Sequence, residues 1–214
     1  MKMYKRISYV FLAICFLTFV VYGITNFIKN TETEQEIQSI LEELYTVEEP
    51  DSEEPPSEET VSEPEQNENT QPYVPYRVST NKEVDGILKI DSINLELPIF
   101  SEMTDSNLKI SCTRVPASPP PGRGVNYCIM GHRMSTYGKI FNRLNEVKIK
   151  DIITVQVKGG IIYRYEVVEI FVTKGLDTNI FKQGEEEMIT IFCCSKKVPD
   201  GRLVVKGKFV EIIT

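Results

Sequence analysis

The sequence predicts a mainly β protein: a single closed antiparallel β-barrel of about eight strands with short helices, preceded by an N-terminal transmembrane helix and a disordered acidic linker. Three observations predict this class. The chain opens with a long uncharged apolar run, continues through an acidic stretch rich in proline, and ends in short β-favouring runs separated by turn residues. We therefore divide it into residues 1–30 (cytoplasmic tip and anchor), 31–72 (juxtamembrane helix and tether) and 73–214 (folded domain).

The apolar run from Ile7 to Ile28 has 22 residues and no charge. About 20 residues cross a bilayer as a helix. The alternative is a cleaved signal peptide, whose apolar core usually has about 7–15 residues before a small-x-small site. This run is longer and no convincing site follows it, so an uncleaved single-pass anchor is favoured. Lys2, Lys5 and Arg6 precede the run, which predicts a cytoplasmic N-terminus and an extracellular remainder.

Residues 32–47 predict a short helix, because their aliphatic residues recur at helical spacing. A stalk helix and a partner-binding helix are both open, and a frayed juxtamembrane helix is favoured. Residues 48–71 have ten acidic side chains, four prolines and no basic residue. Such a segment cannot bury enough apolar surface to fold, so it predicts an extended tether that holds the folded domain off the membrane.

Charge is divided unevenly along the chain, whose net charge is −7. Residues 1–72 carry four basic and fifteen acidic side chains, a net charge of −11. Residues 73–214 carry twenty basic and sixteen acidic side chains, a net charge of +4. The acidity therefore belongs to the linker, and the small, scattered positive charge of the folded part gives no indication of nucleic-acid binding.

Short β-favouring runs fill the folded part, which predicts many short strands in one closed or nearly closed barrel. The predicted strands cover residues 86–90, 93–99, 125–130, 151–157, 161–173, 188–194 and 202–213. Residues 158–160, Lys-Gly-Gly, predict a tight hairpin between two of them. The one predicted helix of this part covers residues 137–147, where Ile140, Phe141 and Leu144 share a side.

Two residues indicate cysteine chemistry. His132, the only histidine, directly follows an apolar strand, and Cys194 ends another strand. Nucleophilic cysteine chemistry needs a thiolate, and a free thiol with a pKa of about 8.5 is mostly protonated at neutral pH. A positively charged histidine beside the sulfur favours the thiolate. Each residue alone is more often structural, a lone histidine as a packed side chain and a strand-end cysteine as a small core residue.

Strand parity separates the two adjacent cysteines at residues 193 and 194. Alternate residues of a strand face opposite sides, so Cys194 shares a face with Phe192, and Cys193 shares one with Ile191 and Ile189. The purely aliphatic face is the better candidate for the core. We therefore predict that Cys193 is buried and that Cys194 is exposed.

Arg202 follows Cys194 by eight residues, across a turn that contains Pro199, Asp200 and Gly201. If the two strands pair as a hairpin, the guanidinium comes near the sulfur. A fixed, always-charged fork suits a developing oxyanion or a substrate carbonyl. A surface arginine at a strand start is the simpler interpretation of this residue by itself.

Together these residues resemble the sortase family. Sortases carry Thr-Leu-x-Thr-Cys at the end of one barrel strand, an Arg at the start of the next and a Gly-His motif upstream. This chain has Thr-Ile-Phe-Cys-Cys at 190–194, Arg-Leu-Val-Val at 202–205 and Gly-His-Arg at 131–133. Residues 85–90 and 97–99 are similar to the family's opening strands, so the match covers roughly residues 84–213. Cys193 departs from the pattern, which has Thr there.

The resemblance implies a sortase-type barrel and a two-step acyl transfer at a Gram-positive cell surface. Cys194 would attack a backbone carbonyl in an LPXTG-like sorting signal of a secreted surface protein, giving a thioacyl enzyme. His132 would protonate the departing amine and later deprotonate the incoming one, while Arg202 steadies the carbonyl oxygen or the bound signal. An amine of a peptidoglycan cross-bridge or a pilin lysine would accept the acyl group. No cofactor takes part in the chemistry.

The resemblance leaves the class less defined. The Gly131-His132-Arg133-Met134 and Asp200–Val205 phrases are similar to class B, but residues 174–189 are too few for the extra helix of that class, so a class A or D-like enzyme is favoured. Calcium activates some class A relatives through acidic clusters. Residues 185–187 are acidic, yet residues 116–126 contain no acid, so a solvated loop is favoured over a calcium site.

Other interpretations stay open. A disulfide between Cys112 and Cys128 is conceivable outside the membrane. The same Cys–His–Arg site could be a hydrolase that uses water as acceptor, which an assay with and without added amine would separate. The chain could also be a non-catalytic, membrane-tethered barrel that binds a cell-wall partner, and such a protein would be indifferent to replacement of Cys194.

Overall fold

A computed structural model describes residues 2–46, 75–123, 125–175 and 177–214. The predicted acidic tether, residues 48–71, lies outside the described residues. The chain separates into two compact units, Met1–Ser39 and Ile40–Thr214.

Helix α1 (Lys2–Thr46) contains the whole described part of the first unit. From Phe11 onward it includes an 18-residue window with a mean hydropathy of 2.1, none of it buried. By length and composition this helix can cross a membrane, although a signal sequence near an N-terminus passes the same test. The apolar helix is consistent with the predicted anchor, and its orientation stays a prediction.

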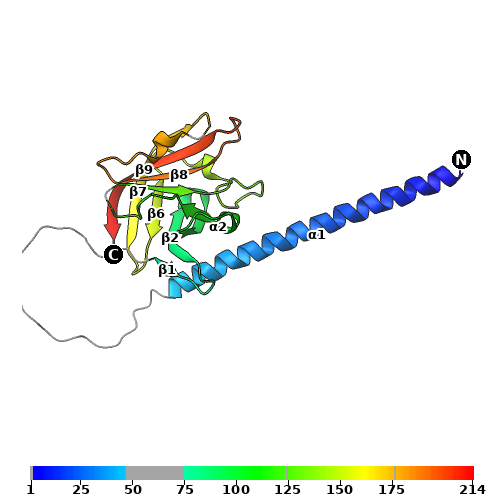
Figure 1. Cartoon of the computed structure of the whole chain (residues 1–214), viewed down its shortest axis with the longest axis horizontal. Coiled ribbons are helices and arrows are strands. Elements are labelled where there is room, and N and C mark those ends of the chain that lie inside the picture. The colour runs from blue at the N-terminus through cyan, green and yellow to red at the C-terminus, as the bar shows by residue number, and fades with distance from the viewer. Residues whose placement is uncertain (1, 47–74, 124, 176) are drawn as a thin grey trace, which may run out of the picture. The chain divides into compact units, whose positions relative to one another are not determined.

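The second unit is built around one closed sheet (Figure 1). Its strands are β1 (Tyr76–Arg77), β2 (Glu83–Ile90), β3 (Leu95–Phe100), β4 (Cys112–Arg114), β5 (Asn126–Met130), β6 (Ile152–Gln156), β7 (Ile162–Val172), β8 (Met188–Cys194) and β9 (Arg202–Ile213). Their order is β1-β2-β3-β4-β5-β8-β9-β7-β6. Because β6 also pairs with β2, eight strands close into a barrel, and β1 is added at one end of β2.

The predicted closed barrel of about eight strands is confirmed, with one difference in direction. The pairs β3–β4 and β5–β8 are parallel, whereas the sequence predicted antiparallel pairing. Parallel neighbours need a crossover connection. The chain supplies one between β5 and β8 by first forming β6 and β7, which pair with each other elsewhere in the barrel. This crossover places the end of β5 beside the end of β8.

The predicted helix over residues 137–147 is wrong except for the short 3₁₀ helix η2 (Leu144–Glu146). The segment instead folds back on the residues that follow β5. Ile140 forms a β-bridge with Arg133, and the Phe141 N–H donates to the His132 carbonyl at 3.2 Å. Ile140, Phe141 and Leu144 are all buried, so the apolar spacing reports core contacts rather than a helix. Folding back in this way fixes the backbone of His132.

The other short helices are α2 (Asp105–Ile110) and the 3₁₀ helices η1 (Asp91–Ile93) and η3 (Thr178–Phe181). Thr104 caps α2, since its hydroxyl accepts a hydrogen bond from the Asn107 N–H at 3.2 Å. Helix η3 lies in the connection between β7 and β8 and contributes a buried residue, Ile180, to the packing on β8.

The last residues of α1 belong to the barrel unit. Its aliphatic residues Ile40, Leu41 and Leu44 are buried. The Glu43 carboxylate accepts the Ser79 N–H at 2.8 and 3.0 Å through its two oxygens. In addition, the Tyr45 hydroxyl donates to the Glu96 carboxylate, and the Lys89 ammonium lies 5.0 Å from the centroid of the Tyr45 ring. The interpretation of these residues as a frayed helix is therefore wrong.

A fragment of residues 32–214 is expected to melt several degrees above a fragment of residues 73–214. The longer fragment keeps three buried aliphatic side chains, each contributing up to about 1.5–3 kcal/mol before the cost of ordering the segment. For a protein of this size about 1 kcal/mol corresponds to about 2–4 °C. Thermal unfolding followed by circular dichroism measures the difference, and Leu44→Glu in the longer fragment should remove it. Equal melting temperatures would show that residues 40–46 add nothing.

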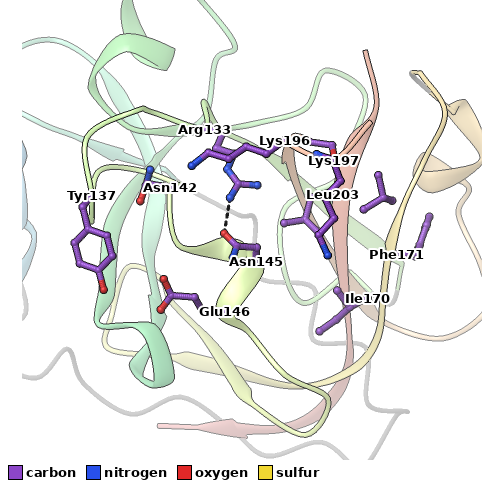
Figure 2. A pocket seen from close by; sticks show the side chains of 12 residues that line it. Arg133, Tyr137, Asn142, Asn145, Glu146, Ile170, Phe171, Lys196, Lys197 and Leu203 are labelled. Atoms are coloured by element: carbon purple, nitrogen blue, oxygen red, sulfur yellow. Dashed lines mark hydrogen bonds between the residues drawn. The ribbon is translucent and has the colours of Figure 1, made fainter. Parts of the chain in front are cut away.

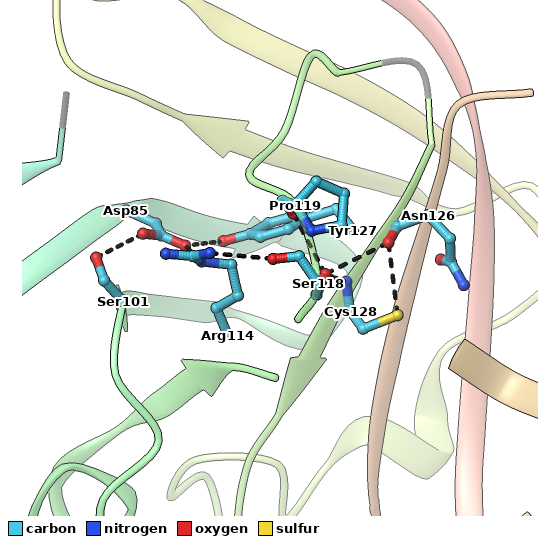
Figure 3. Close-up of polar contacts among 8 residues, drawn as sticks. All are labelled: Asp85, Ser101, Arg114, Ser118, Pro119, Asn126, Tyr127 and Cys128. Atoms are coloured by element: carbon cyan, nitrogen blue, oxygen red, sulfur yellow. Dashed lines mark hydrogen bonds and ion pairs between the residues drawn. The ribbon is translucent and has the colours of Figure 1, made fainter. Parts of the chain in front are cut away.

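A buried ion pair joins three strands at the start of β5 (Figure 3). Asp85 of β2 is 1% exposed and accepts hydrogen bonds from Arg114 Nε at 2.7 Å, the Tyr127 hydroxyl at 3.0 Å and the Ser101 hydroxyl at 2.5 Å. Arg114 also donates to the Ser118 carbonyl at 3.0 Å. The carboxylate is thus fully hydrogen-bonded in the barrel wall, at the opposite end of β5 from His132.

Asp85→Asn is expected to lower the free energy of unfolding by about 3 kcal/mol, because the Arg114 guanidinium loses its buried counter-charge. Glu83→Gln is the matched control, since it breaks the exposed pair with Arg77 at 2.8 Å and should cost less than about 1 kcal/mol. Urea unfolding of the two variants gives both values. Similar losses in the two would mean that the buried pair has no special structural role.

Candidate active site

His132, Cys194 and Arg202 are brought into one row across three neighbouring strands. In the parallel pair β5–β8, Met130 is level with Phe192, and the Gly131 N–H donates to the Phe192 carbonyl at 3.3 Å. His132 therefore follows at the level of Cys194. In the antiparallel pair β8–β9, Cys194 is directly opposite Arg202. Because neighbouring strands lie about 4.8 Å apart, the three side chains start within reach of one another.

The row continues one face of the sheet. Met130 and Phe192 precede His132 and Cys194 by two residues, and Val204, on the antiparallel strand β9, is paired with Phe192. These three side chains form an apolar cluster with Ile180 and Phe181 of η3. The rings of Phe181 and Phe192 have centroids 5.4 Å apart. Since alternate strand residues share a face, His132, Cys194 and Arg202 lie at the open end of this apolar face.

The opposite face enters the barrel interior. A Cβ atom at Gly131 would lie 2.6 Å from the Phe141 ring, so only glycine fits before His132. Cys193 is buried, and its sulfur lies 3.9 Å from the Phe141 carbonyl. The predicted burial of Cys193 and exposure of Cys194 are confirmed. The reason differs in part, because Phe192 is also buried: the position of Cys194 at the strand end is what exposes it.

Burial gives the thiols of the barrel different ionisation behaviour. It raises the pKa of Cys112 and of Cys193 to about 12 and that of Cys128 to about 11, so these sulfurs stay protonated at neutral pH. All of the cysteines are free, and Cys112 and Cys128 do not form the conceivable disulfide. Among the described residues from Ile40 onward, Cys194 is thus the one exposed thiol.

Iodoacetamide is expected to label only Cys194 in a native fragment of residues 32–214 between pH 7 and 9. The other three thiols have folded-state pKa values above the ordinary 9.0, so folding is favoured by their neutral form. That contribution is complete below pH 9 and is lost as the pH rises through about 11–12. Labelling of all four is therefore expected only above pH 9 or in urea, as peptide mapping after a pH series would show. Native labelling of Cys193 at pH 8 would contradict the assignment.

Local hydrogen bonds position Arg202. Its Nη1 group donates to the carbonyls of Asp200 and Gly201 at 3.0 and 3.1 Å, and its backbone N–H donates to the Thr173 hydroxyl at 3.1 Å. The turn before it is tight, because a Cβ atom at Gly201 would lie 2.5 Å from the Thr173 carbonyl oxygen. The guanidinium is therefore held at the turn with donors left over for a ligand.

The His132 side chain is exposed at the end of β5. Within the described part of the chain no side chain hydrogen-bonds its ring, so its position comes from the backbone. Two hydrogen bonds hold that backbone: the Gly131 N–H donates to the Phe192 carbonyl, and the Phe141 N–H donates to the His132 carbonyl.

A cavity of about 550 Å³ lies beside the row, and no sequence pattern indicated it (Figure 2). It is lined by Arg133, Tyr137, Asn142, Asn145, Glu146, Ile170, Phe171, Val172, Ser195, Lys196, Lys197 and Leu203. Its walls come from the segment after His132, from the turn after Cys194 and from β7 and β9. Only the folded-back course of residues 133–147 could have indicated it, and that course depends on tertiary pairing.

Two of the three acidic residues at 185–187 are engaged in protein contacts. Glu187 accepts hydrogen bonds from the Gly122 N–H at 2.9 Å and the Tyr165 hydroxyl at 2.8 Å, and Glu186 pairs with Lys208 at 3.0 Å. Among the residues that the structure describes, no three His, Cys, Asp or Glu side chains gather as metal ligands would. The absence of a cofactor or calcium stays a prediction.

The structure thus combines a closed barrel with an exposed cysteine, a histidine and an arginine at adjacent strand ends. The sequence profile of the family described as "Sortase domain" matches residues 88–210, more than half of the chain. The chain belongs to the sortase family.

Individual relatives agree with this assignment. Sortase A of Bacillus anthracis is 32% identical over 130 residues, 60% of this chain and 61% of that relative, so the match spans about three-fifths of the relative's length. The solved structure of sortase A from Corynebacterium diphtheriae has a TM-score of 0.56 at 28% identity, covering 61% of this chain and 62% of that one. A Clostridium perfringens sortase D5 transpeptidase gives 0.54 at 26%, covering 60% and 79%.

Proposed function

We propose that this protein is a membrane-anchored cysteine transpeptidase that cleaves an LPXTG-like sorting signal and transfers the signal's protein to an amine of the cell wall or of a pilin. One observation carries the proposal: the exposed thiol of the barrel stands between His132 and Arg202 at the ends of three paired strands. The named relatives support a class A or D-like enzyme. The anchor would place the N-terminus in the cytoplasm and the barrel outside the membrane.

In the first step the Cys194 thiolate attacks the scissile carbonyl, and a tetrahedral intermediate forms. Arg202 stabilises the developing oxyanion with the donors that its turn leaves available. The C–N bond breaks as His132 gives a proton to the departing amine, which leaves a thioester on Cys194. No cofactor is needed for these bond changes.

In the second step an acceptor amine attacks the thioester carbonyl. His132 takes the amine's proton, the C–S bond breaks, and the new amide leaves with the thiolate restored. The apolar face beside the row supports binding of the signal. Met130 and Phe181 are partly buried next to Phe192, so they can contact the aliphatic residues of a bound peptide.

An end-product assay tests this function. A fragment of residues 32–214 is incubated with a sorting peptide, with and without an added primary amine, and products are separated by chromatography. Transpeptidation predicts an amide product that appears only with the amine, together with faster release of the leaving peptide. Cleavage to the free acid alone, unaffected by amine, would indicate a hydrolase. No cleavage by any sorting peptide, with unchanged binding to a cell-wall fraction after Cys194→Ala, would indicate a non-catalytic barrel.

A further inference from the structure

Asn126, the first residue of β5, is a polar side chain for which the proposed chemistry has no use, yet it is only 5% exposed. Alternate residues of a strand share a face, so Asn126 shares one with Met130, two positions before His132. In Figure 3 the Asn126 amide points away from Asp85. Asn126 therefore lies on the apolar face, at the far end from the row.

Both ends of the Asn126 amide are hydrogen-bonded. Its Oδ1 accepts from the Thr190 hydroxyl at 2.7 Å. Its Nδ2 donates to the Ile180 carbonyl at 3.0 Å and to the Lys182 carbonyl at 3.3 Å. A carbonyl can only accept, so the NH2 group must face these two, which fixes the orientation of the amide. A buried amide costs free energy unless it is paired, so Asn126 is stable on this face because of these partners.

The two carbonyls belong to the end of η3 and stand on either side of Phe181. The last carbonyls of a helix lack partners within the helix, and the Asn126 amide supplies one to each. The Asn126 backbone adds two contacts with the next residue but one, Gln183. Its N–H donates to Gln183 Oε1 at 2.9 Å, and its carbonyl accepts from Gln183 Nε2 at 3.3 Å. Asn126 therefore holds the η3 backbone immediately before and after Phe181.

Phe181 connects this restraint to the row. Its ring packs on Phe192, which precedes Cys194 by two residues on the same face. Ile180 is 2% exposed and packs on Phe192 in the same apolar cluster. The position of η3 therefore determines the shape of the apolar face next to Cys194.

We propose that Asn126 is a positioning residue for substrate binding: its amide holds η3 on β8, so that Phe181 and Phe192 present an ordered apolar wall to the sorting signal. The inference rests on the proposed function and adds to it a residue that takes no part in bond making. Without the Asn126 amide, η3 loses its hold and the peptide has to order the wall when it binds. This weakens peptide binding and leaves the thiol unchanged.

Asn126→Asp tests the proposal, because aspartate has the same shape and still accepts from Thr190, but it turns an oxygen instead of an NH2 group toward the two carbonyls. With a fluorogenic sorting peptide, KM should rise about tenfold or more and kcat should change less than about threefold. The rate of Cys194 alkylation by iodoacetamide should stay within about twofold, since this small reagent does not need the apolar face. An unchanged KM, or equal losses in kcat and in the alkylation rate, would overturn the proposal.

Two further variants separate positioning from a general loss of stability. Gln183→Ala, at an exposed position, removes the two contacts with the Asn126 backbone and should raise KM about two- to fivefold. Tyr127→Phe is the matched control: it deletes one buried hydrogen bond, to Asp85 at 3.0 Å, from the neighbouring residue of β5. It should leave KM within about twofold of the original value. A KM rise in Tyr127→Phe as large as that in Asn126→Asp would contradict a specific role for Asn126.

A methyl spectrum keeps this outcome separate from failure of the proposed function. The isoleucine methyl groups are labelled with carbon-13, and the Ile180 resonance is followed, since Ile180 packs on the Phe192 ring and feels its ring current. In Asn126→Asp this resonance should move toward its value in the unfolded protein, and in Tyr127→Phe it should stay in place. An unmoved resonance in Asn126→Asp would overturn the proposal even if the enzyme transfers peptides. A moved resonance in a protein that forms no thioacyl enzyme would support the hold of Asn126 on η3 and contradict the transpeptidase.

Discussion

Cys194→Ala will lower peptide cleavage at least about 10³-fold, and Cys193→Thr will keep activity within several-fold of the original. Cys194 is the exposed thiol at the level of His132, so its loss removes the proposed nucleophile. Cys193 faces the interior, where burial raises its pKa to about 12. A threonine hydroxyl at that position can donate to the Phe141 carbonyl, which the Cys193 sulfur now contacts. The values of kcat/KM for a fluorogenic sorting peptide give both effects.

The two changes must also be compared for folding. Circular dichroism and urea unfolding are measured on both variants. The free energy of unfolding of Cys194→Ala should match that of the original protein to within about 1 kcal/mol, since that side chain is exposed. A folded Cys193→Thr protein without activity would mean that the sulfur of Cys193 takes part in the reaction. An active Cys194→Ala protein would exclude the proposed chemistry.

Arg202→Ala will lower kcat/KM about 10²–10³-fold, the usual effect of removing one oxyanion donor. Arg202→Lys should recover little of this loss. Lysine keeps the positive charge but lacks the guanidinium fork, which binds the Asp200 and Gly201 carbonyls and still has further N–H donors for a substrate. The measurement is the rate of thioacyl formation in a single turnover, which isolates the first step from acceptor binding.

Arg164→Ala is the control for charge, since Arg164 pairs with Glu211 at 2.7 Å on the surface of β7 and β9. Its activity should stay within about twofold of the original. If Arg164→Ala and Arg202→Ala have equal effects, the charge of Arg202 acts only at long range. If Arg202→Ala has no effect, the third member of the row is not part of the site.

The row of three residues was predictable from local sequence because each member stands at a strand end. His132 follows one apolar run, Cys194 ends another and Arg202 begins a third. What local sequence could not give is the neighbour of each strand. The β5–β8 pair is parallel and joins segments separated by β6 and β7, so its register depends on closure of the whole barrel.

The segment 137–147 shows why apolar spacing alone is ambiguous. Ile140, Phe141 and Leu144 fit a helical face, and all three are buried as a helical face would be. The segment is nevertheless held by the bridge between Ile140 and Arg133, a contact outside any local pattern. The cavity of Figure 2 is partly built on this segment, which is why no sequence pattern indicated it.

The sequence pattern also left out residues that belong to the start of the barrel unit. The acidic residues 48–71 suggested that everything before residue 73 is separate from the barrel. Yet Ile40, Leu41 and Leu44 are buried within the barrel unit, and Glu43 binds the Ser79 N–H. The spacing of these aliphatic residues was visible in the sequence, but the surface that covers them was not.

The mass of the protein after incubation with a sorting peptide tests the central claim most directly. A fragment of residues 32–214 is mixed with the peptide, quenched in acid within seconds and measured intact, and the modified residue is located by peptide mapping. The transpeptidase predicts an added mass equal to the peptide's acyl portion, carried by Cys194, removed by hydroxylamine and absent from Cys194→Ala. An adduct on any other residue would contradict the account. So would peptide cleavage without any adduct, provided that Cys194 of the same protein sample is alkylated normally.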